Sequence, residues 1–274
     1  MKFAICNETF GDWNLSDALK LARETGYTGW EVAPFMLSDD IRNFDQQARK
    51  NYRRQVEQAG LEIIGLHWLL AKTEGLYLTS HEEHVQKSTA SYLEQLAELC
   101  RDLGGKVMVL GSPQQRNVPE GQSMDSAMEC AAKVLASVTP TLENTGVQIA
   151  VEPLGREEGN FLNHASDART LIDQIGHPSI QLHLDVKAMS DEGIPIDQII
   201  RDNASAMIHF HANDPNRRGP GMGEVDFTPI FRALKEIDYR GWTSVEVFDY
   251  TPGIETLVVE SMDNMRKTLD NLTS

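Results

Sequence analysis

Residues 147–152, VQIAVE, alternate apolar side chains with polar or small ones and end in a glutamate. Val147, Ile149 and Val151 form one apolar face, which is typical of a strand covered by helices on its outer side. Successive side chains of a strand point to opposite faces, so the second face ends in Glu152. The segment predicts a buried strand that carries a carboxylate at its carboxyl end.

Three later segments repeat this pattern. They are residues 180–185 (IQLHLD), 207–211 (MIHFH) and 244–247 (SVEV), and each has one apolar face. Their second faces become polar toward the end and carry Asp185, His211 and Glu246. Four consecutive strands therefore each place one acidic or imidazole side chain at the same end.

Strand-like and helix-like segments alternate along the whole chain. Several of the helical segments end in glycine, which favours the left-handed conformation that closes a helix. About eight strand–helix units predict a single (β/α)8 TIM-barrel domain over residues 1–274, in preference to an open doubly wound sheet. Strands are expected to begin near Lys2, Gly29, Leu61, Lys106, Val147, Ile180, Ala206 and Thr243. Helices are expected at Leu15–Thr25, Phe44–Ala59, His81–Leu103, Ser123–Asn144, Ala165–Ile175 and Pro229–Ile237, and in a last segment from Ile254 to Leu272.

The composition limits the class of protein. The 274 residues are 41% apolar and 24% charged, with a net charge of −16, which argues against a nucleic-acid partner. The three cysteines form no CxxC pair and the first residues form no apolar leader, so we expect a cytoplasmic protein. We expect no membrane span, since no apolar run approaches about 20 residues. A homo-oligomer is compatible with this composition.

The four strand-end residues predict a metal centre. Neighbouring strands of a barrel bring their carboxyl ends together, so Glu152, Asp185, His211 and Glu246 are expected to converge. Three carboxylates at one place repel each other unless a cation neutralises them. One divalent ion is therefore the expected cofactor. The oxygen-rich set favours Mn²⁺ or Mg²⁺, and Co²⁺ and Zn²⁺ are also compatible.

At these residues the chain resembles the xylose-isomerase-like barrel superfamily of sugar phosphate isomerases and epimerases. Within it, the chain resembles the D-tagatose and D-psicose 3-epimerase group. The resemblance covers essentially the whole chain. It is carried by residues 151–153 (VEP), 183–185 (HLD), 210–217 (FHANDPNR), 220–227 (PGMGEVDF) and 245–248 (VEVF).

The resemblance implies roles for individual residues. Glu152, Asp185, His211 and Glu246 would bind the metal, and Glu152 and Glu246 would also be the catalytic acid/base pair. Glu158 would support the first glutamate, and Arg217 would hold a substrate oxygen. The implied reaction is isomerisation or epimerisation of a keto-sugar or related polyhydroxy carbonyl compound, by proton abstraction through a metal-bound enediolate.

One position departs from the epimerases. They carry a histidine three residues after the aspartate that corresponds to Asp185, where this chain has Ala188. The change puts activity on free ketohexoses in doubt. It favours a bulkier or ring-closed substrate, with an anionic group reached by Lys187, Arg116 or Arg217.

Further rim residues are candidates for substrate contacts. His67 and Trp68 end a strand at the height of a sugar pocket, and Lys187 follows Asp185. Asn7, Glu8 and Glu31 are weaker candidates. His183 and His209 are expected to be satisfied core or supporting histidines, since metal ligands need such partners. Ser112 follows another strand, where its loop could bind an oxyanion.

Two other activities on the same scaffold compete with that of an epimerase. A lyase acting on a keto-cyclitol or a 3-keto-glycoside would use the same site and begin with the same proton abstraction. An apurinic-site endonuclease needs further metal ligands on the second to fourth strands, where the sequence offers only Glu31 and His67. The acidic net charge of this chain is also wrong for a DNA substrate. A catalytically inactive binding barrel does not explain why all four ligands are present.

Overall fold

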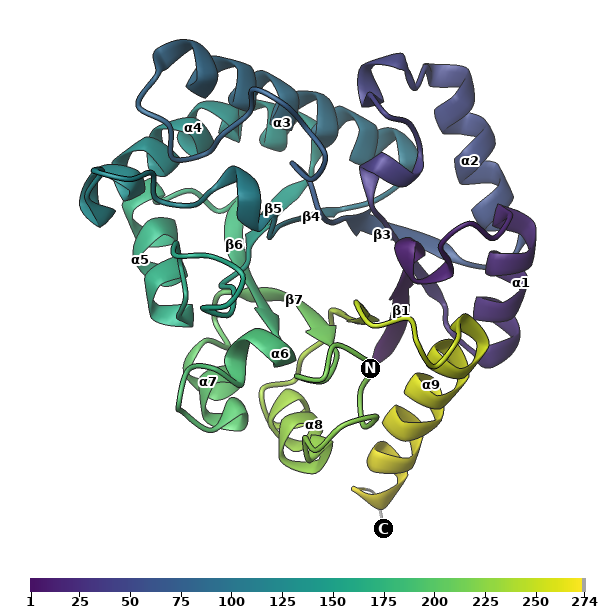
Figure 1. The fold of residues 1–274 in the computed structure, drawn as a ribbon. Coiled ribbons are helices and arrows are strands. Elements are labelled where there is room, and N and C mark those ends of the chain that lie inside the picture. The colour runs from purple at the N-terminus through teal and green to yellow at the C-terminus, as the bar shows by residue number, and fades with distance from the viewer. Residues whose placement is uncertain (273–274) are drawn as a thin grey trace.

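The computed structural model describes residues 1–272 and contains a closed barrel of parallel strands surrounded by helices (Figure 1). The strands follow one another around the barrel in chain order, and β8 pairs with β1. This confirms the predicted fold and excludes the open sheet. The strands are β1 (Lys2–Cys6), β2 (Gly29–Val32), β3 (Glu62–Leu66), β4 (Val107–Leu110), β5 (Gln148–Val151), β6 (Ile180–Asp185), β7 (Met207–Ala212) and β8 (Trp242–Val245).

The helices form the outer ring around the strands. They are α1 (Leu15–Thr25), α2 (Gln46–Gln58), α3 (Glu83–Leu103), α4 (Met124–Thr145), α5 (Ala165–Ile175), α6 (Val186–Met189), α7 (Ile196–Asp202), α8 (Phe227–Glu236) and α9 (Ile254–Asn271). The short 3₁₀ helices are η1 (Asn7–Phe10), η2 (Pro34–Met36), η3 (Ile41–Asn43) and η4 (Pro113–Gln115). α1 and α5 have the predicted bounds, and the other predicted helices agree to within two residues. The predicted domain also includes residues 273 and 274, which lie outside the described part of the chain.

Glycine closes several helices as predicted. Gly26 and Gly104 have φ angles of 109° and 94°, and each donates its backbone N–H to carbonyls of the last helical turn. A residue with a Cβ is strained in this left-handed conformation. These glycines therefore turn the chain sharply from a helix into the next strand.

The two faces of the strands match the alternation in the sequence. Val147, Ile149 and Val151 are at most 1% exposed and belong to the apolar layer between strands and helices. The register of β6 on β7 shifts between Leu182 and His183. After this shift His183 pairs with His209, and Asp185 pairs with His211. The two strands thus carry two layers of polar residues, one above the other.

None of the helices in residues 1–272 combines the length and the apolar character that crossing a membrane requires.

Candidate active site

The four predicted ligands lie at the carboxyl ends of four adjacent strands. Glu152 directly follows β5, Asp185 ends β6, His211 is the penultimate residue of β7, and Glu246 directly follows β8. All four are buried, with at most 7% of each residue exposed. The structure therefore brings the four side chains to one end of the barrel, where barrel enzymes place their catalytic groups.

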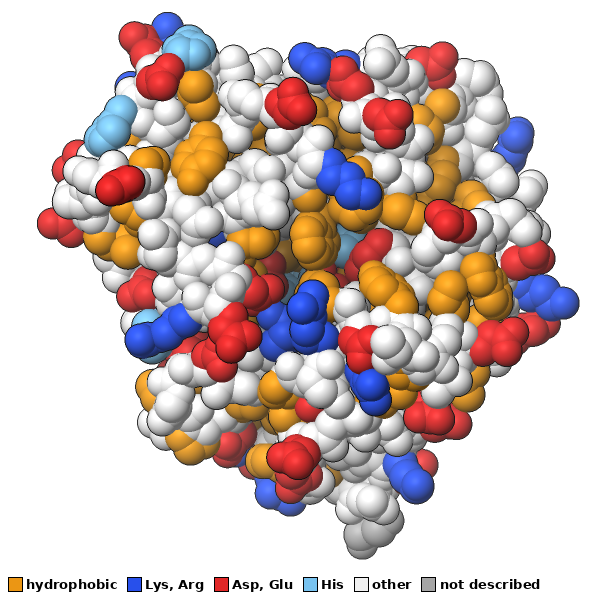
Figure 2. All heavy atoms as spheres, viewed as in Figure 1, with side chains coloured by type: hydrophobic (Ala, Val, Ile, Leu, Met, Phe, Trp, Pro, Cys, Tyr) orange, Lys and Arg blue, Asp and Glu red, His pale blue; other side chains and the backbone are white. Residues whose placement is uncertain are grey.

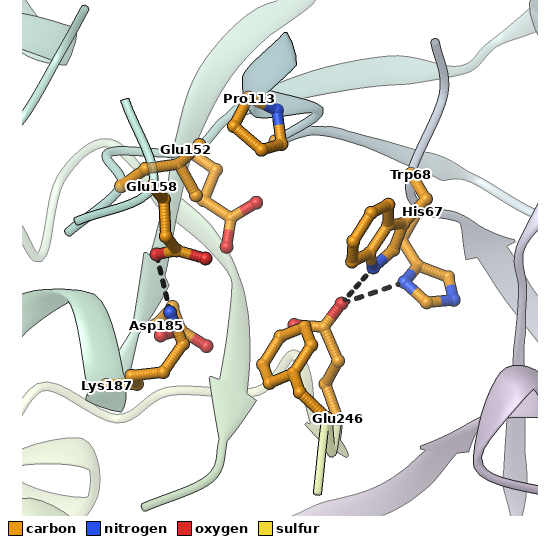
Figure 3. A pocket seen from close by; sticks show the side chains of 11 residues that line it. His67, Trp68, Pro113, Glu152, Glu158, Asp185, Lys187 and Glu246 are labelled. Carbon is orange, nitrogen blue, oxygen red and sulfur yellow. Dashed lines mark hydrogen bonds and ion pairs between the residues drawn. The ribbon is translucent and has the colours of Figure 1, made fainter. Parts of the chain in front are cut away.

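A narrow pocket opens at this end. The face is hollowed at its centre, and basic side chains gather along one edge of the hollow (Figure 2). Within the pocket, Glu152 and Glu246 lie on opposite sides of the same space (Figure 3). The lining consists of His67, Trp68, Gly111, Pro113, Glu152, Leu154, Glu158, Asp185, Lys187, Glu246 and Phe248.

Glu152 occupies a niche that only glycine permits at position 111. A Cβ on Gly111 would lie 1.6 Å from Oε2 of Glu152. The carboxyl group is buried, and Glu246 and Asp185 add negative charge nearby, so the pKa of Glu152 is raised well above its usual value. In the metal-free protein Glu152 therefore tends to keep its proton.

Glu246 is held by three donors on the other side of the pocket. Its Oε1 accepts a 2.7 Å hydrogen bond from Nε1 of Trp68 and lies 3.1 Å from Nδ1 of His67. Its Oε2 lies 3.0 Å from Nδ1 of His211. Burial alone would raise the pKa of Glu246, but the charges and hydrogen bonds of His211 and His67 outweigh it and lower that pKa well below its usual value. The two facing glutamates thus differ in protonation.

Glu31, a weak candidate from the sequence, supports His211 from beneath. Its Oε2 lies 3.2 Å from Nε2 of His211 and 3.0 Å from Nε2 of His209. Burial opposes ionisation, but the two histidines lower the pKa of Glu31 well below its usual value. An acceptor on one ring nitrogen fixes the orientation of the other, so Glu31 directs Nδ1 of His211 toward Glu246.

Glu8 plays a similar part for His67. Its Oε2 lies 2.9 Å from Nε2 of His67, whose other nitrogen faces Glu246. Glu8 lies in η1, just after β1, and its side chain is 10% exposed. No local sequence pattern pairs these residues, because they follow β1 and β3, which are not adjacent in the barrel.

Asp185 is fixed by its own strand end. It is the N-cap of α6, and its Oδ1 accepts from the backbone N–H of Ala188 at 2.8 Å. Its Oδ2 accepts a 2.6 Å hydrogen bond from Nδ2 of Asn213. Burial raises the pKa of Asp185 to about 6, although Lys187 acts against this shift. Ala188 contributes its backbone to this arrangement and does not line the pocket.

His183 was expected to be a satisfied histidine, and this prediction was wrong. It is fully buried, and neither of its ring nitrogens has a hydrogen-bond partner among the described residues. Its Nε2 lies 3.6 Å from Oε1 of Glu152, beyond hydrogen-bond length. Burial and the neighbouring His211 and His209 lower the pKa of His183 well below its usual value. His209 is held as expected at Nε2, which lies 3.0 Å from Oε1 of Glu31. Its Nδ1 has no hydrogen-bond partner among the described residues.

Lys187 reaches into the pocket, a direction that the sequence left open. Its ammonium group contacts Oε2 of Glu158 at 2.5 Å and lies 5.2 Å from the centre of the Phe248 ring. Glu158 also accepts from the backbone N–H of Gly155 at 3.2 Å. The Glu158 carboxylate therefore contacts Lys187 and the backbone of its own loop.

Arg217 lies farther out than the other candidates. It is exposed and lines a second hollow of the rim, which it shares with Glu158, Lys187 and Phe248. Its guanidinium carbon lies 5.9 Å from the centre of the Phe248 ring. Arg217 is thus placed to contact a part of a ligand that extends beyond the central pocket.

Arg116 is buried below the pocket. It is 1% exposed and donates to the backbone carbonyls of Leu110 at 3.0 Å and Phe161 at 3.3 Å. Burial lowers its pKa to about 10, while the charges of Glu152 and Glu158 act in the opposite direction. The hydroxyl of Ser112 also has a structural role, since it accepts a 3.0 Å hydrogen bond from the backbone N–H of Leu70.

The residues fit a divalent cation. Glu152, Asp185, His211 and His183 offer ligand atoms that lie within 4.8 Å of one another, and Glu246 is bonded to His211. The raised pKa values of Glu152 and Asp185 show that these buried carboxylates lack enough positive charge nearby. A bound cation would supply that charge.

Comparisons with known proteins show to which family the chain belongs. The family model described as xylose isomerase-like TIM barrel matches residues 19–268. A 3-dehydro-D-guloside 4-epimerase of Escherichia coli (strain K12) is 25% identical over 252 residues, which cover 90% of this chain and 92% of the relative. A probable ketose 3-epimerase of Synechocystis sp. is 28% identical over 235 residues, covering 84% of this chain and 77% of the relative.

Solved structures show the same fold. An apo 3-keto-D-glucoside 4-epimerase from E. coli superposes with a TM-score of 0.82 at 20% identity, covering 98% of this chain and 99% of the other. An L-ribulose 3-epimerase gives a TM-score of 0.84 at 22% identity, with 99% and 95% covered. The names of the sequence relatives support an isomerase or epimerase activity. The closed barrel and the match over residues 19–268 place the chain in the xylose isomerase-like TIM barrel family.

Proposed function

We propose that this protein is a divalent-metal-dependent epimerase or isomerase of a keto-sugar or a related polyhydroxy carbonyl compound. The observation that carries the proposal is the pair Glu152 and Glu246, which face each other across one pocket with pKa values shifted in opposite directions. Two carboxyl groups whose environments separate their pKa values can act as a general acid and a general base.

The two glutamates have distinct roles in one direction of the reaction. Glu246, held ionised by Trp68, His67 and His211, removes the proton from the carbon next to the carbonyl group. Glu152, on the opposite side, returns a proton to the other face of that carbon. In the reverse direction the roles exchange. Net inversion at one carbon requires such an arrangement of one group on each face.

The expected metal ligands are Glu152, Asp185, His211 and Glu246. When bound, the ion would polarise the substrate carbonyl and so make the neighbouring carbon–hydrogen bond more acidic. The chain's own residues prepare the site for it. Glu31 orients His211, Asn213 and the Ala188 N–H orient Asp185, and the missing Cβ of Gly111 leaves room for Glu152.

A keto-glycoside is our preferred substrate class. One relative is named a 3-dehydro-D-guloside 4-epimerase, and it is similar over nearly the full length of both chains. The central pocket here adjoins the rim hollow lined by Arg217, so a ring with a substituent could occupy both. Trp68 and Phe248, with ring centroids 6.1 Å apart, provide apolar surface at the pocket wall.

The test is a substrate screen in D₂O with added Mn²⁺, read by NMR and mass spectrometry. Keto-sugars, keto-cyclitols and 3-keto-glycosides are supplied separately. We expect a product of unchanged composition that gains one deuterium at the inverted or isomerised carbon. Loss of water or of an aglycone would identify a lyase instead, and a product without deuterium would exclude proton abstraction by exchangeable glutamates.

A further inference from the structure

The polar layer beneath the pocket contains more ligand atoms than the expected metal site uses. His183 lies on β6 two residues before Asp185, so both side chains face the lumen. Its ring is fully buried, and both nitrogens lack hydrogen-bond partners among residues 1–272. Buried polar atoms without partners are rare in folded proteins, and each one calls for an explanation.

The surroundings of His183 are those of a ligand position. One ligand atom of His183 lies within 4.8 Å of ligand atoms from Glu152, Asp185 and His211. Its ring centroid is 4.2 Å from that of His211, with the two rings at 73°. The Nε2 atom lies 3.6 Å from Oε1 of Glu152, too far for a hydrogen bond and close enough for two ligands of one ion.

The neighbouring histidines differ from His183 in this respect. His211 has both nitrogens occupied, by Glu246 and Glu31. His209, the cross-strand partner of His183, is anchored through Nε2 by Glu31. Of these three, only His183 has no hydrogen-bond partner for either nitrogen among residues 1–272, so no hydrogen bond with these residues fixes the orientation of its ring.

We propose that His183 is an additional ligand of the metal, beside Glu152, Asp185, His211 and Glu246, so that the ion is bound by two imidazoles, His183 and His211, and by three carboxylates. This inference rests on the proposed function, since it assigns a further ligand to the same centre. A second nitrogen makes the donor set less oxygen-rich. Imidazole suits Zn²⁺, Co²⁺ and Ni²⁺, whereas Mg²⁺ prefers oxygen, so the site selects borderline metals over Mg²⁺.

The first measurement counts imidazoles directly. The purified chain is stripped with a chelator, reloaded with one equivalent of Zn²⁺ or Co²⁺, and examined by X-ray absorption spectroscopy. We expect scattering from two imidazoles in the unmodified protein and from one in His183→Gln. A single imidazole in both proteins would overturn the assignment.

The second measurement is a set of metal titrations that need no substrate. His183→Gln should weaken binding of Zn²⁺ and Co²⁺ by at least about 10-fold, the lower end of the loss seen when even an outer partner of a ligand is removed. Binding of Mg²⁺ should change much less. The matched control is His209→Gln, which removes a histidine from the same buried layer and should keep two imidazoles on the metal.

The outcomes separate this inference from the proposed function. If the unmodified protein binds none of these ions, the metal dependence itself fails. If it binds an ion with the same affinity and the same imidazole count in His183→Gln, only the His183 assignment fails. If affinity falls while the count stays unchanged, His183 acts by positioning Glu152, and its assignment as a ligand is overturned. Circular dichroism of each variant shows whether the barrel is intact.

Discussion

The indole Nε1 of Trp68 donates a 2.7 Å hydrogen bond to Oε1 of Glu246, so a residue that follows β3 fixes the carboxylate that follows β8. Trp68 adopts a φ angle of 54°, an uncommon conformation for a bulky residue. Strain at such a position is retained where the surrounding structure requires it. Here the conformation places the indole over the pocket, against the base that we propose.

Trp68→Phe should lower kcat with little change in the fold. Hydrogen bonds to charged groups contribute about 1.5–3 kcal/mol, which corresponds to at least ~10-fold in rate if the bond positions Glu246 in the transition state. Steady-state kinetics measure the effect. Trp13→Phe, at a surface residue 37% exposed, is the control and should retain normal turnover. Equal kinetics for the two variants would contradict the role of Trp68.

Replacing either catalytic glutamate should have a larger effect. Glu152→Gln and Glu246→Gln should each reduce turnover by at least ~10²-fold, the usual scale for loss of a general acid or base. Deuterium exchange into substrate, measured separately from product formation, should be lost in the variant that lacks the base for that direction. If both variants exchange at the normal rate, the two residues are not the acid/base pair.

Metal binding should depend on pH with a defined sign. The pKa of Asp185 is raised to about 6, so the carboxyl group holds its proton up to that pH in the metal-free protein. A ligand carboxylate must be ionised, and protons therefore compete with the metal as the pH falls through about 6. Calorimetric titrations at pH 8, 7, 6 and 5 should show affinity that weakens as the pH falls, because Asp185 and Glu152, whose pKa is also raised, must both be ionised to bind the ion. An affinity that rises on acidification would be inconsistent with Asp185 as a ligand.

About one divalent ion per chain should raise the thermal midpoint, because a ligand that binds only the native state stabilises it. The combined change Asp185→Asn and His211→Ala should abolish both the binding and the thermal shift. Elemental analysis and thermal unfolding with and without a chelator measure the two effects. Full metal occupancy in the double variant would refute the assigned site.

The substrate prediction concerns Ala188. We expect weak activity on tagatose, fructose and psicose and higher activity on ring-closed keto-compounds. Ala188→His should not improve the native reaction, because Ala188 contributes its backbone N–H to Asp185 and lines no part of the pocket. Kinetics on matched sugars and keto-glycosides test this. High turnover of D-fructose to D-psicose by the unmodified protein would show the prediction to be wrong.

Strand parity made the upper layer of the site predictable from sequence. Alternation along β5 to β8 indicated that Glu152, Asp185, His211 and Glu246 share one face, and adjacency in the barrel then brought them together. The layer that supports them was harder to predict. Glu31 and His209 are separated by 178 residues and meet across the lumen, a distance that no local pattern encodes.

The directions of side chains near the strand ends could not be predicted from the sequence either. Lys187 is the second residue of the short helix α6, and its ion pair with Glu158, 29 residues earlier, shows that it faces the pocket. The state of His183 depends on the register shift between β6 and β7, which sets it opposite His209. Such irregularities arise from packing of whole strands and leave no mark in the hydrophobic pattern.

The contact of Glu31 with His209 and His211 joins the two halves of the barrel through its centre. A fragment containing only β1 to β4 would keep the Glu31 carboxylate in its interior and lose both imidazoles that stabilise it. A fragment containing β5 to β8 would lose the acceptor that anchors the two histidines. Removing one partner of a buried charged pair is strongly destabilising. Each half-barrel would therefore lose these buried ion pairs on separation, and only a counterpart that supplies the matching carboxylate or imidazoles restores them.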